Sequence, residues 1–281
     1  MPIYEQSYRR YQARGPLRRA RFWPITREAL RLLLERRAFL LLLFVAWGPL
    51  LVRIIQVYVV TRFPEAGRVL PVDGRMFGQF LNGQLFFVVL VSIFGGAGLV
   101  ANDLRTGAIL VYLSRPLTRR DYVLGKLGVL LLLNLAVTLA PGLLLYGAAL
   151  GLAPGRFATW ELAWIGPAVA LHAFLICAVA SVVALAVSSL SRSARVAGLG
   201  FVGLMVGLEV ASGVVRAIFR NPWSTLLSIQ ASLRAVGNAL FGVAEGTAPL
   251  HWVYPALLLA LVAAGSLLVL RARVRAVEVV R

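Results

Sequence analysis

Three ionisable side chains lie inside long apolar runs and are the best candidates for chemistry: Arg53, His172 and Glu209. A charged group at bilayer depth costs about 2.5–3.5 kcal/mol on insertion scales, so such groups usually mark a pathway or a polar pair. We therefore expect Glu209 to face a cavity, or to pair with Arg53 or with another polar group. The alternatives are a protonated Glu209 packed against small residues, and an Arg53 side chain that extends to the membrane surface.

An intramembrane enzyme would need His172 and Glu209 to meet in one cavity. The sequence holds no H-E-x-x-H motif, no G-x-S-x-G motif and no cluster of metal ligands. One histidine, one glutamate and the single cysteine are too few for a catalytic site. The only lysine, Lys126, follows Gly125, but Arg120 stands where a phosphate-binding G-x-x-x-x-G-K-[ST] loop needs glycine. We expect no catalytic residue, no metal, no cofactor and no P-loop in this chain.

The segment from residue 99 to residue 126 is the charged interruption between two apolar runs. Apolar residues recur at helical spacing from Asn102 to Leu113, which predicts a short helix with one apolar face. Pro116 then breaks the chain direction. The charged residues of this segment are Asp103, Arg105, Arg115, Arg119, Arg120, Asp121 and Lys126.

Thr118 and Asp121 have the spacing of a capping box, in which each side chain bonds the backbone N–H of the other residue. They predict the start of the next helix, with Leu117 and Tyr122 placed to form a hydrophobic staple. The result is a rigid helix–break–helix arm, which suits force transfer. The alternative is an ordinary solvated loop whose positive charges set the topology.

This segment resembles the coupling region of ABC-2-type transporter permeases, the membrane subunits of ABC transporters. The matching residues read D-L-R-T-G from Asp103 and Y-L-S-R-P-L-T-R from Tyr112. In that family the segment lies between the second and third spans and holds the helix that docks on a separate nucleotide-binding subunit. The resemblance implies an ATPase-coupling site made of Asp103, Arg105, Thr106, Gly107, Tyr112, Leu113, Ser114, Arg115, Pro116 and Arg119.

The composition excludes a water-soluble globular protein, because 60% of the 281 residues are hydrophobic and several apolar runs are long enough to cross a bilayer. We predict an all-α membrane protein with six transmembrane helices, at about 38–60, 78–100, 122–150, 164–190, 196–218 and 253–270. The single cysteine lies in an apolar run and permits no internal disulfide.

Basic residues predict the orientation of these spans. Of the 29 arginines and lysines, 21 fall on the side that holds both termini and 7 on the other, with Arg53 inside a span. Cytoplasmic loops carry the excess of positive charge, so we expect both termini in the cytoplasm. This placement explains the net charge of +18 without nucleic acid as a partner.

We divide the chain into residues 1–37, a basic tail with an interfacial helix, and residues 38–281, a six-span domain with its coupling segment at 102–118. Arginines alternate with aromatic residues in the tail, a pattern that favours anionic lipid head groups over RNA, and we expect no signal peptide. Pro24–Arg37 reads as an amphipathic helix in the head-group plane. Its predicted apolar face consists of Ile25, Ala29, Leu32 and Leu33.

Small and polar residues inside the spans predict close helix packing. They are Asn82, Gln84, Ser181, Ser188, Ser189 and the Gly95–Gly98 run. Pro141–Gly142 predicts a kink in the third span. In the long segment from Arg216 to Trp252, apolar residues at spacings of three and four predict one or two short helices, on the outer surface or dipping into the bilayer.

The resemblance implies a permease subunit of an ATP-driven transporter in the cell's inner (cytoplasmic) membrane, more specifically an exporter. It also implies two ATPase subunits that bind the ATP, and a second permease copy or a related permease. We expect Tyr112, Leu113, Arg115 and Pro116 to touch the ATPase, with Asp103 and Arg105 supporting their geometry. The rival interpretations are a membrane subunit that transmits ATPase work without moving a substrate, and the intramembrane enzyme. The sequence does not identify a substrate.

Overall fold

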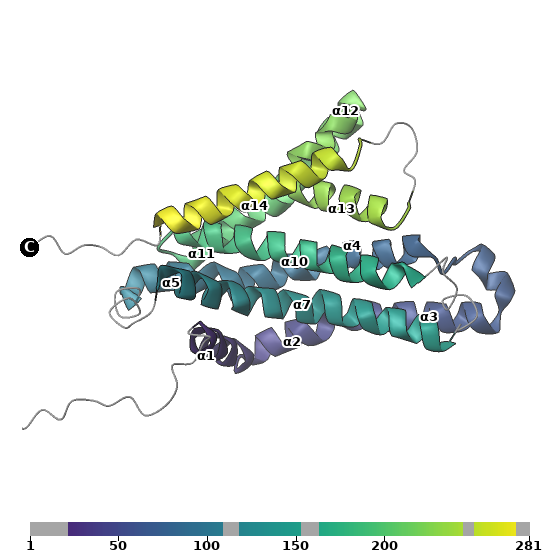
Figure 1. Cartoon of the computed structure of the whole chain (residues 1–281), viewed down its shortest axis with the longest axis horizontal. Helices are drawn as coiled ribbons and strands as arrows, with labels where there is room; N and C mark the ends of the chain where they lie inside the picture. The colour runs from purple at the N-terminus through teal and green to yellow at the C-terminus, as the bar shows by residue number, and fades with distance from the viewer. Residues whose placement is uncertain (1–21, 109–117, 153–162, 244–249, 274–281) are drawn as a thin grey trace, which may run out of the picture.

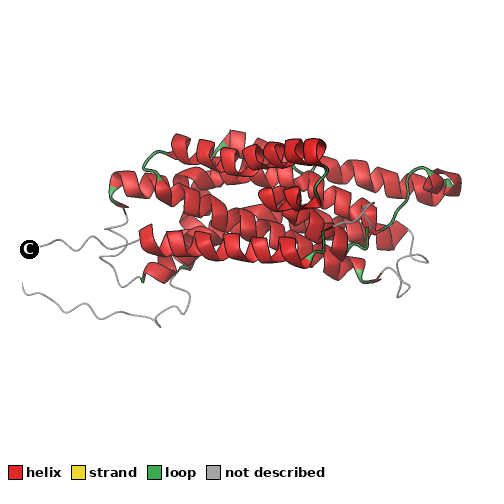
Figure 2. Ribbon diagram, turned by 90° about the horizontal axis from the view of Figure 1, so that it is seen from above, coloured by secondary structure: helices red, strands yellow, loops and turns green. Residues whose placement is uncertain are grey.

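The computed structural model describes residues 22–108, 118–152, 163–243 and 250–273. These residues form helices and loops and contain no β-strand (Figure 2). Six helical segments are long and apolar enough to cross a membrane and run along one another (Figure 1): Arg37–Arg62, Gly74–Thr106, Arg119–Leu152, Ile165–Leu190, Ala194–Phe219 and Val253–Arg273. The predicted all-α class with six spans is confirmed.

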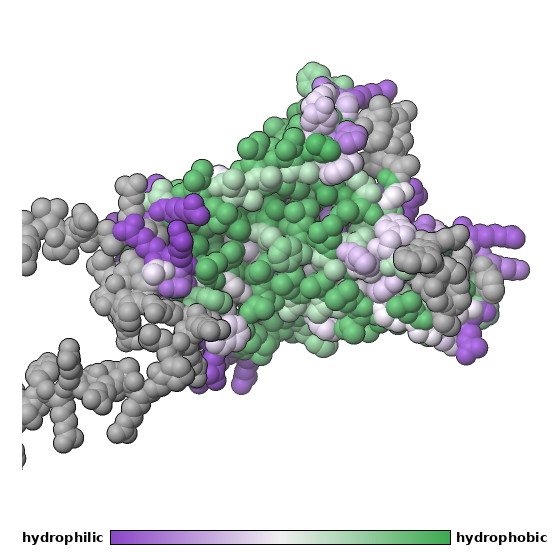
Figure 3. Space-filling model, in the orientation of Figure 1, coloured by the Kyte–Doolittle hydropathy of each residue, from purple (hydrophilic) through white to green (hydrophobic). Residues whose placement is uncertain are grey.

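The two ends of the bundle differ from its middle. Apolar side chains cover the surface between the ends, and polar side chains gather at the ends themselves (Figure 3). We call one end the Lys126 end, where the helices end at Thr106, Leu190 and Arg273, and the opposite one the Arg234 end. An apolar belt between polar ends is what a multi-pass membrane protein requires, because lipid tails cannot solvate polar groups.

The fourth span, α10 (Ile165–Leu190), is the centre of the bundle and packs on α7 (Arg119–Leu152), on α14 (Val253–Arg273) and on the second and fifth spans. Small residues let α7 and α10 approach closely: a Cβ on Gly142 would lie 3.0 Å from Val169 Cγ1. Helix α7 continues through Pro141, at the position where we predicted a kink.

The first span is divided into α2 (Arg37–Val45) and α3 (Gly48–Arg62). Pro49 lies in the first turn of α3 and has no N–H to continue the helix, so the chain breaks just before it. The Gln84 side chain of the second span donates a hydrogen bond of 3.1 Å to the Ala46 carbonyl at this break. Gln84 therefore joins the second span to the first, as a polar residue between packed helices was predicted to do.

The second and fifth spans each contain a π-helical turn. The second span consists of α4 (Gly74–Val91), the π turn η2 (Ser92–Gly96) and α5 (Ala97–Thr106). The fifth consists of α11 (Ala194–Val202), the π turn η3 (Gly203–Gly207) and α12 (Leu208–Phe219). A π turn interrupts the regular i→i−4 bonding of a helix and frees backbone groups near it.

Ser188 of α10 bonds three backbone groups of α5 just after the π turn. Its hydroxyl accepts from the backbone N–H groups of Val100 and Ala101 at 3.2 and 3.1 Å and donates to the Ala97 carbonyl at 2.7 Å. Nearby, the Asn134 side chain of α7 donates to the hydroxyls of Ser92 and Ser181. Ser181 and Ser188 therefore bond between helices as predicted.

Short helices fill the Arg234 end, as the sequence predicted. The 3₁₀ turn η4 (Pro222–Leu227) is followed by α13 (Ile229–Leu240). Helix α13 packs on α14, α10 and α4, so it lies against the bundle. A further short 3₁₀ turn, η1 (Pro64–Arg68), follows the first span.

Candidate coupling site at the Lys126 end

A buried ion pair joins the second and third spans where they border residues 109–117. Lys126 Nζ of α7 lies 2.8 Å from Asp103 Oδ2 of α5, and the Tyr122 hydroxyl donates to the same oxygen at 2.8 Å. The Lys126 and Asp103 side chains are 7% and 16% exposed. The ammonium group also lies 5.6 Å from the Tyr122 ring centroid, within cation–π range. Removing either charge would leave the other without its counter-ion in a site with little water.

The predicted capping box at the start of α7 is confirmed. The Thr118 hydroxyl accepts from the Asp121 N–H at 3.2 Å, and Asp121 Oδ2 accepts from the Thr118 N–H at 3.0 Å. This reciprocal bonding satisfies N–H groups that a helix start leaves without partners. It fixes where the third span begins, four residues before Tyr122 contacts Asp103.

Helix α1 (Trp23–Leu34) packs directly beside this ion pair. The Thr26 hydroxyl donates to the Gly125 carbonyl at 2.9 Å in a buried bond between residues 99 positions apart. A Cβ on Gly125 would lie 3.0 Å from Ile25 Cβ, and one on Gly128 would lie 3.2 Å from Thr26 Oγ1. The two glycines therefore let the predicted interfacial helix lie against α7, one residue from Lys126.

The buried face of α1 lacks one predicted residue, Leu32, and gains Thr26 together with the partly buried Leu30 and Leu34. Ile25 and Leu33 are buried and Ala29 is partly buried, but Leu32 is 53% exposed. Thr26 is polar but can be buried because its hydroxyl has a hydrogen-bond partner on α7. Pro24 lies in the first turn, as predicted.

Residues 102–106 are helical as predicted, but they are the last turns of the second span and not the start of a separate short helix. The second span continues as one helix to Thr106, and Gly107 ends it with φ +72°, a left-handed conformation that suits glycine. Arg105 and Thr106 are exposed on the last turn, and Arg119 is exposed on the first turn of α7. Asp103 instead points into the bundle toward Lys126. The remaining predicted coupling residues lie outside the described residues: Tyr112, Leu113, Ser114, Arg115 and Pro116.

The three intramembrane candidates lie in separate environments, and the proposed pairing of Glu209 with Arg53 is wrong. Arg53 of α3 donates to the amide oxygens of Gln56 and Gln79, at 2.7 and 3.4 Å. Glu209 of α12 forms an ion pair with Arg234 of α13 and accepts from the Ser228 hydroxyl. The alternative that Glu209 pairs with another polar group is therefore correct.

His172 of α10 is fully buried against α13. The position of a Cβ on Gly237 lies 2.5 Å from His172 Cε1 and Nε2, and the Phe241 ring meets the imidazole edge-on at 5.9 Å. Neither imidazole nitrogen has a hydrogen-bond partner among the described residues. Glu209 and His172 contact different residues of α13 and share no described cavity, so the geometry gives no support to the intramembrane enzyme.

Sequence reasoning missed three residues of the coupling site as functional positions: Thr26, Tyr122 and Lys126. One signal was present, since the chain's only lysine stands just inside an apolar run, where a cation needs a partner. Identifying Asp103 as that partner requires knowing how α5 packs beside α7, which the spacing of residues along the chain does not give.

A comparison with protein-family models places most of the chain in a known family. Residues 30–269 match the model described as "ABC-2 family transporter protein". No curated protein matches the chain. The matched region begins within α1 and includes the first five spans, most of the sixth, the Asp103–Lys126 pair and both π turns. The chain belongs to the ABC-2 family of transporter membrane proteins, as a multi-pass permease component of an ABC transporter.

Proposed function

We propose that this permease receives force from a separate ATPase subunit at the Lys126 end and uses it to move the second and third spans. The observation that carries the proposal is the buried contact among Asp103, Tyr122 and Lys126. It ties the last turn of α5 to the first turns of α7, on both sides of residues 109–117. A push on that segment then moves both helix ends together.

The exposed polar residues of these ends suit contact with a second protein. Arg105, Thr106 and Arg119 are exposed, while the ion pair beside them is buried. The exposed side chains are accessible to a partner, and the ion pair keeps the ends of α5 and α7 in place. In this proposal Tyr112, Leu113, Arg115 and Pro116 contact the ATPase, and Asp103 positions the arm that carries them.

The same proposal places the protein in the cell's inner membrane with both termini in the cytoplasm, and assigns it export through a pathway formed with a second permease copy or a related chain. Large exposed apolar side chains on the first and fifth spans support a partner or lipid contact there, among them Leu51, Ile55, Val210 and Ile218. ATP would be bound by the partner ATPase alone.

Replacing Lys126 with Met tests the coupling function. The chain is reconstituted in vesicles with its ATPase, and ATP-dependent flux and ATP hydrolysis are measured together. We expect Lys126→Met to lower flux per ATP about tenfold, because Asp103 loses its counter-ion and only the Tyr122 hydroxyl is left to hold it to α7. Lys126→Arg keeps the charge and should retain most of the flux.

The control is Arg192→Gln, which removes an exposed charge at the same end of the bundle but outside the coupling site. It should transport like the parent. Unchanged flux per ATP in a correctly inserted Lys126→Met variant would contradict the coupling role. ATP hydrolysis that responds to the permease without any flux would instead support a subunit that transmits work without a cargo.

A further inference from the structure

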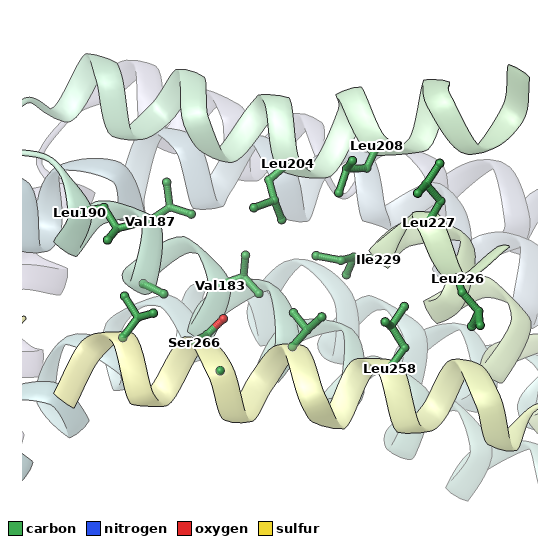
Figure 4. Close-up of a pocket in the computed structure, with 14 residues that line it drawn as sticks. Val183, Val187, Leu190, Leu204, Leu208, Leu226, Leu227, Ile229, Leu258 and Ser266 are labelled. Atoms are coloured by element: carbon green, nitrogen blue, oxygen red, sulfur yellow. The ribbon is translucent and has the colours of Figure 1, made fainter. Parts of the chain in front are cut away.

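An apolar crevice runs along the bundle between the fifth and sixth spans. Its volume is about 470 Å³. Helix α10 forms its floor through Val183 and Val187, α12 and η3 form one wall, and α14 forms the other (Figure 4). Ser266 is the one polar side chain among the described residues that line it.

The two walls stay apart because each is held by other elements. Helix α14 packs on α10 and α13, whereas α12 packs mainly on η4. Leu204 and Leu208 face Leu258 and Ser266 across the opening (Figure 4). The volume falls in the range of pockets that hold small ligands, roughly 300–1,000 Å³. An almost wholly apolar lining of this size fits a hydrocarbon chain.

The crevice becomes polar toward the Arg234 end. Positions four residues apart share a helix face, and along α12 this stripe changes from Leu208 to Ser212 and then to Arg216. Ser212 donates to the Ser224 carbonyl at 2.7 Å, and Arg216 donates to Thr225 Oγ1 at 2.6 Å. Both acceptors belong to η4, whose Leu226 and Leu227 close the crevice.

The charge at this end is positive. Residues 203–243 contain three arginines, Arg216, Arg220 and Arg234, but one acid, Glu209, and that acid is paired with Arg234. Arg216 is exposed and has no carboxylate partner among the described residues. The polar end therefore offers a guanidinium to an anion, at the level where a chain lying in the crevice would end.

Aromatic residues mark the same level as a membrane interface. Trp223 of η4 is 51% exposed, and its ring lies 5.2 Å from that of Tyr254 at the start of α14. Tryptophan and tyrosine gather at the depth of lipid head groups, where one part of the ring is apolar and the other wet. This depth is where the phosphate of a bilayer lipid lies, above its acyl chains.

We propose that an anionic phospholipid of the surrounding bilayer binds here, with one acyl chain in the crevice and its phosphate at Arg216. The lipid is a bound component of the permease and holds the fifth span beside the sixth. The site is at the opposite end from the coupling site and uses none of its residues. The lipid site can therefore be tested independently of the proposed transport role.

Filling the crevice with a side chain tests the proposal. Gly265 lines the crevice, and a Cβ there meets nothing within 4 Å, so Gly265→Leu occupies the acyl-chain position without a clash in the protein. The matched control is Gly213→Leu on α12, where a Cβ also meets nothing within 4 Å but lies outside the crevice. A second filling variant, Ser266→Phe, serves if Gly265→Leu is poorly folded.

The full chain is purified in detergent after exposure to an equimolar mixture of a phosphatidylglycerol and a phosphatidylcholine with equal chains, and native mass spectrometry counts the retained lipids. We expect the parent and Gly213→Leu to retain more phosphatidylglycerol than phosphatidylcholine. Gly265→Leu should retain at least about tenfold less, because a leucine side chain replaces the methylene contacts of the lipid. Arg216→Gln should retain lipid but lose the preference for phosphatidylglycerol.

Three outcomes would overturn the proposal. The first is equal retention of phosphatidylglycerol by Gly265→Leu and the parent. The second is retention of both lipids without preference by the parent chain. The third is a disulfide between two chains carrying Ser266→Cys in a Cys177→Ala background, which would show that a second copy covers the crevice.

Discussion

At the scale of single residues, most polar groups inside this bundle serve other residues of the same chain. Glu209 neutralises Arg234, Arg53 bonds two glutamine side chains, and Asp103 holds Lys126. Each charge thereby avoids the cost of standing alone in a medium without water. This local pairing explains why charged residues in apolar runs need not line a transport pathway.

The contact between His172 and Gly237 gives a sharp prediction at this scale. Gly237→Ala should lower the free energy of unfolding by about 1–3 kcal/mol, because the new methyl group overlaps the imidazole ring. Thermal or denaturant unfolding in detergent measures the change. Gly213→Ala, in the open on α12, should not destabilise and should gain up to about 1 kcal/mol from the higher helix propensity of alanine.

A double-mutant cycle shows whether the ring itself is responsible. His172→Ala creates a cavity of its own, but Gly237→Ala should cost much less in that background than in the parent. Equal costs of Gly237→Ala in both backgrounds would mean that the imidazole does not set the position of α13.

At the scale of elements, the two π turns divide the second and fifth spans at places where α5 and α11 meet. Ala97 and Ala101 of α5 pack on Ala197 of α11, and a Cβ on Gly198 would approach Ala97 Cβ to 3.6 Å. Small side chains at this contact let the two half-helices lie close and slide with little interlocking. Helices α5 and α11 thus pack as a pair at the Lys126 end, and the π turns separate them from α4 and α12.

Ser188 is expected to stabilise the second span through the groups freed at its π turn. Ser188→Ala should cost about 1–3 kcal/mol, because the N–H groups of Val100 and Ala101 lose their acceptor in a buried site. Ser189→Ala is the matched control, since that hydroxyl donates only to the Ala186 carbonyl of its own helix. Unfolding measurements that give equal costs for the two substitutions would refute this role.

The number and approximate places of the spans were predictable, but the end of the second span, at Thr106 rather than near residue 100, and the interruptions of the spans were not. Length and apolar content locate six crossings, and the Thr118–Asp121 spacing locates the start of α7, because both signals are local. The π turn at Ser92–Gly96 lies within a continuous apolar run, and its stability depends on Ser188, which is distant in sequence. The partner of Glu209 was likewise hidden, because it depends on α13 folding back against α12.

At the scale of the whole molecule, the polar ends and the apolar belt define a membrane orientation that labelling can test. In a Cys177→Ala background, Arg220→Cys at the Arg234 end should react with a membrane-impermeant maleimide in intact cells. Arg192→Cys, at the Lys126 end but outside the coupling site, should react only after the cells are opened. The physical reason is the excess of basic residues at the Lys126 end, which favours the cytoplasm.

Both positions are exposed in the structure, so differences in reactivity report the side of the membrane rather than burial. The reverse pattern would place the coupling site outside the cell, where no ATP-driven partner could reach it, and would refute the proposed function.

The burial of Lys126 has a practical consequence for mapping this subunit in an assembled transporter. It is the chain's only lysine, and its ammonium is shielded by Asp103 and Tyr122. Succinimide-ester cross-linkers, the usual reagents of cross-linking mass spectrometry, will therefore find no accessible side-chain amine on this subunit. Neighbours of the permease have to be mapped through introduced cysteines or through reagents that attack carboxylates.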